Sequence, residues 1–77
     1  MGITQLVTMA NEIAAFFDGA SEPNEAPQSV AAHLRRYWDP RMRKQIVEHV
    51  ASGGEGLVPT ARIAVELMAS DQLRASQ

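Results

Sequence analysis

The chain has 77 residues, which is enough for one small domain, and its formal net charge at pH 7 is -2. It contains no cysteine, so a disulfide-stabilised scaffold, a thiolate nucleophile and a cysteine zinc site are excluded. A domain of this size buries little apolar surface, and an oligomer or a partner protein is therefore an expected source of further stability.

The first segment, from Thr4 to Phe17, has the pattern of an amphipathic helix with Thr4 as its N-cap. Its apolar side chains recur at intervals of three and four residues: Leu6, Val7, Ala10, Ile13, Ala14 and Phe17. Asn11 and Glu12 interrupt the apolar run, which argues against a signal peptide. No stretch approaches the roughly 20 apolar residues of a membrane span. We therefore expect a cytoplasmic protein that does not contact a membrane.

Proline and glycine predict where the next helices begin and end. Residues 18–27 form a loop, and Pro27 fits the first turn of a second helix. That helix should stop near Trp38, because a residue that precedes proline is disfavoured in the α conformation. Asp39 and Pro40 are then the N-cap and first residue of a third helix. Its apolar face contains Met42, Ile46, Val47 and Val50.

The rest of the chain predicts one more helix. The sequence SGGEG at residues 52–56 ends the third helix, with Gly53 just past its last turn, and Pro59 opens the fourth. Ile63, Ala64, Leu67 and Met68 are expected to face inward. No segment alternates as a strand does. We predict an all-α fold, a small bundle of about four short helices, in a single domain over residues 1–70 with a flexible tail at 71–77.

Five of the seven cations lie within residues 33–44, HLRRYWDPRMRK, which we call the basic segment: Arg35, Arg36, Arg41, Arg43 and Lys44. It also contains the only tryptophan, and Trp and Arg are enriched at the energetic centres of interfaces. Cations in the first turn of a helix oppose its dipole, so Arg41 and Arg43 indicate an acidic partner. Trp38 could instead anchor the core with the arginines as a solvated rim, and both descriptions can hold together. The predicted partner-binding residues are Arg35, Arg36, Trp38, Asp39, Pro40, Arg41, Met42 and Arg43.

Other kinds of site have less support. His33 and His49 lie 16 residues apart without metal-ligand spacing, and no nucleophile and base form a recognisable pair. The glycines of residues 53–56 follow a helix and lack the Lys-Ser or Lys-Thr of a phosphate loop, which favours a structural turn. A nucleic-acid interface is an alternative for the basic segment, although the acidic balance of the chain argues against it. We predict no catalytic, cofactor-binding or metal-binding residue.

Three stretches together resemble the delta subunit of NAD-dependent formate dehydrogenase: LVTMANEIAAFF (6–17), AAHLRRYWDPRMRKQIVEHV (31–50) and GGEGLVPTARIAVELM (53–68). The specific feature is the order of MAN, FF, WDPRMR and GGEGL-x-P, since each element alone is weak. Two positions depart from the family pattern. Tyr37 stands where Phe is common, and Val58 precedes Pro59 where a polar capping residue is expected.

The resemblance implies a non-catalytic accessory subunit that docks on the large, molybdenum-containing alpha subunit and supports assembly or stability. In that family the alpha subunit holds a molybdenum or tungsten pterin cofactor and iron–sulfur clusters. Other subunits hold FMN and bind NAD, whereas the delta subunit holds no redox centre. Three alternatives stay open. The arginines could hold the cofactor's pyrophosphate during its insertion, the chain could bind nucleic acid by itself, and the isolated chain could self-associate.

Overall fold

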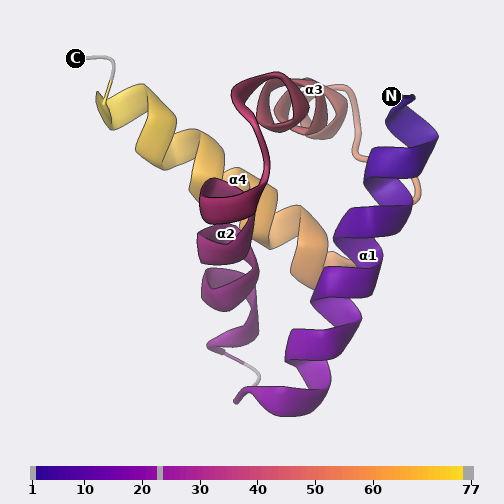
Figure 1. Cartoon of the computed structure of the whole chain (residues 1–77), viewed down its shortest axis with the longest axis vertical. Coiled ribbons are helices and arrows are strands. Elements are labelled where there is room, and N and C mark those ends of the chain that lie inside the picture. Colours follow the sequence, from indigo (N-terminus) through magenta and orange to yellow (C-terminus); the bar gives the residue numbers. More distant parts are fainter. Residues whose placement is uncertain (1, 23, 76–77) are drawn as a thin grey trace.

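The computed structural model describes residues 2–22 and 24–75, with side chains up to residue 70. Within these residues it has four α-helices and no strand. The helices are α1 (Ile3–Ala20), α2 (Ala26–Tyr37), α3 (Pro40–Ala51) and α4 (Pro59–Ala75). Figure 1 shows α1 and α2 side by side, α4 crossing behind α2 towards α1, and α3 at one end of the bundle. The predicted all-α bundle is confirmed.

The first two helices begin slightly earlier than expected. The N-cap of α1 is Gly2, so Thr4 lies within the helix, where its carbonyl accepts a hydrogen bond from the Thr8 hydroxyl at 3.1 Å. The predicted cap at Thr4 is therefore wrong. The N-cap of α2 is Glu25, which makes Pro27 the second helical residue. A missing N–H is still harmless at that position, because the first four N–H groups of a helix have no intrahelical partner.

The junction between α2 and α3 has the predicted form. Trp38 leaves the helical conformation (φ -88°, ψ 137°) and Asp39 is extended (φ -73°, ψ 165°). The Asp39 carboxylate accepts the backbone N–H of Met42 at 2.9 Å, and Pro40 is the first residue of α3. Proline disfavours the α conformation at the preceding residue, so the chain turns here and the aspartate is free to cap.

The connection from α3 to α4 is a glycine turn. Gly53 and Gly54 have φ of +123° and +65°, a region that glycine occupies without a Cβ clash. Their N–H groups donate to the carbonyls of Val50 and His49 at 3.0 and 2.9 Å, which is the hydrogen-bond pattern of a Schellman motif. At its far end, α4 continues to Ala75, past the boundary expected at residue 70. The flexibility of the tail at 71–77 stays a prediction.

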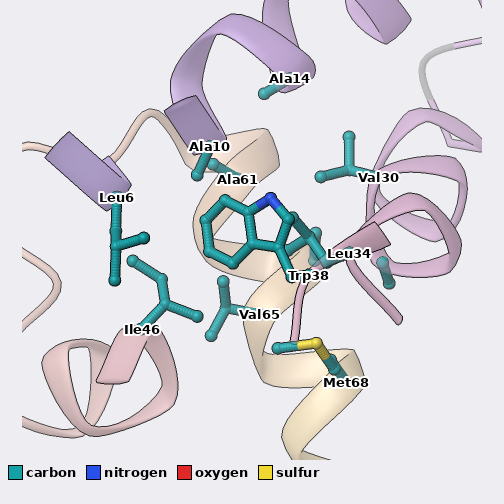
Figure 2. Packing of buried hydrophobic residues seen from close by; sticks show 12 residues of the cluster. Leu6, Ala10, Ala14, Val30, Leu34, Trp38, Ile46, Ala61, Val65 and Met68 are labelled. Atoms are coloured by element: carbon teal, nitrogen blue, oxygen red, sulfur yellow. The ribbon is translucent and has the colours of Figure 1, made fainter. Parts of the chain in front are cut away.

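The core is a cluster of small and medium-sized apolar side chains around one indole (Figure 2). Its buried members are Leu6, Ala10, Ala14, Val30, Ala31, Leu34, Trp38, Ile46, Ala61, Ala64, Val65 and Met68. The many alanines let the helices approach closely. The inward placement of Ile63 and Leu67 was wrong, since these side chains are 45% and 37% exposed. Helix α4 is apolar on more than one side, so periodicity alone did not select the buried face.

Candidate partner-binding surface

The basic segment covers the last turns of α2, the junction and the first turn of α3. Its tryptophan points inward, because Trp38 is only 5% exposed and lies at the centre of the core (Figure 2). The indole is therefore not part of the surface that a folded chain presents to a partner. Trp38 instead ties the junction to the core, and this fixes where the neighbouring arginines leave the surface.

The remaining predicted residues are at least partly accessible. Arg35, Arg36, Asp39, Pro40 and Arg41 are exposed. Met42 and Arg43 are half-buried, and Met42 packs against the core. The Arg43 Nε is buried and has no hydrogen-bond partner among the described residues. The stem of Arg43 is thus held in place by burial, not by an ion pair at Nε.

The two pairs of arginines lie at opposite ends of their helices, where the helix dipoles have opposite effects on a cation. Arg35 and Arg36 lie in the last turn of α2, where the helix dipole favours cations. Arg41 and Arg43 lie in the first turn of α3, where the dipole disfavours them, and apart from the Asp39 cap that precedes it this turn has no acidic residue. Helix stability therefore accounts for the first pair but not for the second. A carboxylate or phosphate from outside the chain would relieve the unfavourable charge at Arg41 and Arg43.

Three side chains make hydrogen bonds with the glycine turn that the sequence did not predict. Asn11 of α1 donates from Nδ2 to the Gly56 carbonyl at 2.9 Å, and its Oδ1 accepts the Val58 N–H at 3.0 Å. Arg62 Nη2 donates to the Gly53 carbonyl at 2.6 Å. His49 Nε2 lies 2.8 Å from the Glu55 carbonyl, a hydrogen bond that requires a proton on Nε2.

These contacts bear on two questions that the sequence raised: whether the glycine turn is a phosphate loop, and how the start of α4 is capped. The N–H groups of Gly53 and Gly54 already donate to α3, and the carbonyls of the turn anchor it to α1, α3 and α4, which supports a structural turn and not a phosphate loop. Asn11 also supplies the cap that Val58 lacks, because it accepts an N–H at the start of α4 from a helix remote in sequence. The only signal for Asn11 in the sequence was a polar residue inside an apolar helix.

A second surface feature is a row of rings that runs from α1 to the end of α2. Phe16, Phe17, His33 and Tyr37 follow one another with centroid separations of 5.1, 6.1 and 4.6 Å. The Arg36 guanidinium lies over the Tyr37 ring, 5.7 Å from its centroid. We call these five residues the aromatic row. The sequence analysis missed it, because it placed only Phe17 of these residues on an apolar helix face and helical periodicity gives no measure of how far a ring is exposed.

The aromatic row borders an open hollow of about 340 Å³. Its lining comes from the second half of α1 and from α2: Met9, Glu12, Ile13, Phe16, Phe17 and His33. His33 is half-buried and has ring neighbours on both sides, so it is a packed helical histidine in this surface. Glu12 and His33 are the only lining residues with ionisable side chains.

Side chains that ligate metals are not clustered in the described residues. No group of three or more histidine, aspartate and glutamate side chains is gathered in a way that could hold an ion in this part of the chain. Across the same residues, no helix is both long and apolar enough to cross a membrane. The described surface presents cations at the junction and rings between α1 and α2, and both kinds of group are suited to recognition.

Comparison with known proteins identifies the family. A search of curated proteins and a search of solved structures found no significant match. The family model of the NADH-dependent formate dehydrogenase delta subunit, FdsD, matches residues 5–65. This range includes most of α1, the basic segment, the glycine turn and the start of α4. The chain therefore belongs to the FdsD family, the delta subunits of NADH-dependent formate dehydrogenase.

Proposed function

We propose that this chain is a non-catalytic subunit that docks on the large subunit of formate dehydrogenase and supports the assembly or stability of the complex. The docking surface consists of the accessible part of the basic segment: Arg35, Arg36, Asp39, Pro40, Arg41, Met42 and Arg43. In this proposal the molybdenum or tungsten pterin cofactor, the iron–sulfur clusters, FMN and NAD belong to the other subunits of a cytoplasmic enzyme.

The observation that carries the proposal is the position of Arg41 and Arg43 at the start of α3. Apart from the Asp39 cap that precedes it, their turn has no acidic residue, and the helix dipole disfavours cations there. The Asp39 cap and Pro40 hold the turn in one conformation, with the buried Trp38 beside it. A rigid surface loses less conformational entropy when it binds. Carboxylates of the large subunit are the partners that this arrangement favours.

The test compares two double variants that have the same net charge. Arg41→Gln with Arg43→Gln lowers the net charge by two, and so does Gln5→Glu with Gln28→Glu, at exposed positions of α1 and α2. The measured quantity is the amount of chain retained on affinity-purified formate dehydrogenase at low and high salt. We expect the arginine variant to be lost, because a central Arg contact contributes on the order of 2 kcal/mol. The glutamate variant should be retained.

Arg62→Glu is not a suitable control, because Arg62 holds the glycine turn and its reversal would disturb the fold. Retention of the arginine variant at the level of the wild type would contradict docking through the basic segment. The isolated chain should not reduce NAD with formate, and formate-dependent activity of the purified chain alone would contradict its accessory role.

A role in the maturation of the cofactor is the second candidate function, because it would use the same cations. Exposed arginines also bind the pyrophosphate of a pterin cofactor, and Arg35, Arg36 and Arg41 are exposed. The two roles differ in the partner that is bound. Association with cofactor-free large subunit only would favour maturation, whereas stoichiometric presence in the active enzyme favours a permanent subunit.

A further inference from the structure

We infer that the hollow beside the aromatic row receives a large apolar side chain of the partner subunit, and that a carboxylate near that side chain contacts Arg36. This inference rests on the proposed docking function and adds a second, apolar contact to it. The partner segment is thus defined by its chemistry: an apolar anchor followed or preceded, within about one helical turn, by Asp or Glu.

The first support for this inference is the solvent exposure of two rings of the aromatic row. Phe16 and Tyr37 are each 66% exposed, the highest exposures among the large hydrophobic side chains that the structure describes as exposed. The chain has only two phenylalanines and one tyrosine. All three therefore lie in the aromatic row, two of them largely outside the core. Aromatic side chains gathered on one surface are typical of protein interfaces.

The chemistry of the hollow favours a protein side chain over a small polar ligand. Small-molecule sites combine an apolar lining with several converging polar groups that fix the ligand. Here the ionisable side chains of the lining are limited to Glu12 and His33. A small molecule would have few groups to orient it, whereas an apolar anchor on a partner needs only shape and burial.

The positive charge of Arg36 indicates that the partner segment also carries a carboxylate. The aromatic row ends in the Arg36 guanidinium, which already lies over the Tyr37 ring. A carboxylate there would meet a cation whose side chain is partly ordered by the ring, so less entropy is lost on pairing. Arg36 also belongs to the basic segment, and the two surfaces are therefore continuous at this residue. One partner face can contact both.

The direct test places a photo-crosslinking residue in the row. p-Benzoylphenylalanine at position 16, in the full chain assembled with the other formate dehydrogenase subunits, should crosslink to one peptide of the partner. We expect that peptide to contain a large apolar residue with Asp or Glu within about one helical turn. The control carries the same group at Ala15, an exposed position of α1 that does not line the hollow, and should give little of this crosslink.

A matched pair of truncations measures the contribution of the row. Phe16→Ala and Ile63→Ala each shorten an exposed apolar side chain, one in the row and one on α4. We expect Phe16→Ala to weaken binding to the complex that lacks this chain by about 10-fold or more, as for an interface hot spot. Ile63→Ala should change the Kd by less than about 2-fold. Circular dichroism should show equal helicity in both variants.

The outcomes separate this inference from the proposed function. Loss of binding in Phe16→Ala with normal binding in the Arg41 and Arg43 variant supports the hollow and overturns the basic segment as the docking surface. The reverse result overturns the hollow and leaves the proposed function in place. A crosslink from position 16 to a second copy of this chain, or to a peptide without a carboxylate near the apolar residue, overturns the inference.

Discussion

Asn11 is the residue whose role differs most from its appearance in the sequence. Its amide bonds with both the Gly56 carbonyl and the Val58 N–H, so one side chain joins α1 to the start of α4. Both positions are more than 40 residues away along the chain. A polar group in this half-buried place replaces a local cap, and the helix start at Val58 is satisfied by tertiary contact.

Replacing Asn11 should therefore destabilise the chain. Asn11→Ala leaves the Val58 N–H and the Gly56 carbonyl without their partner, and we expect the free energy of unfolding to fall by about 1–3 kcal/mol. Asn11→Asp retains an acceptor for Val58 but turns a carboxylate oxygen towards the Gly56 carbonyl, so it should lose stability as well. Urea unfolding monitored by circular dichroism measures both. Thr8→Ala, which removes only a local hydroxyl bond to Thr4, is the control, and an equal loss there would contradict the role of Asn11.

At the scale of elements, the α3–α4 turn depends on backbone conformations that favour glycine. Gly54 is buried and has φ +65°, and a Cβ added there would lie 3.4–3.5 Å from the Arg62 guanidinium. Gly19 offers the opposite environment, because it lies in α1 and a Cβ there would meet nothing within 4 Å. The two positions therefore give opposite expectations for the same substitution.

Gly54→Ala should lower the free energy of unfolding by about 1–2 kcal/mol, since a side chain disfavours the left-handed region. Gly19→Ala should raise it by up to about 1 kcal/mol, because alanine is the better helix former. Thermal unfolding of the two variants beside the wild type measures the difference. A Gly54→Ala variant as stable as Gly19→Ala would show that the turn tolerates a side chain and that its geometry does not constrain α3 and α4.

Features that depend on a few neighbouring residues were predictable from the sequence, whereas features that depend on how the helices pack together were not. Asp39-Pro40 and Gly53 were placed correctly because capping and proline sterics act over a few residues. Ile63 and Leu67 were misplaced because α4 is apolar on several sides and its neighbours choose the buried one. For the same reason the aromatic row was missed, since the exposure of Phe16 and Tyr37 depends on how α1 and α2 lie together.

At the scale of the whole molecule, the single tryptophan links stability to docking. A domain of 77 residues has a free energy of unfolding of roughly 4–12 kcal/mol at the usual value per residue. Removal of a buried tryptophan side chain costs about 3–5 kcal/mol. Trp38 therefore accounts for a large part of the stability of the isolated chain, while its neighbours Arg36 and Arg41 remain at the surface.

Because Trp38 is buried and the arginines near it are exposed, we expect Trp38→Ala to behave differently with and without the partner subunit. The isolated variant should be largely unfolded by circular dichroism, because the core loses its central side chain. A partner that binds only the folded chain adds stability by mass action, about 2.7 kcal/mol at a partner concentration 100-fold above Kd. Helicity and retention should therefore return at high partner concentration. Trp38→Phe, which keeps an apolar ring, should be folded in both conditions. A Trp38→Ala variant that is fully folded alone but fails to bind would instead place the indole in the interface and contradict its role as the core anchor.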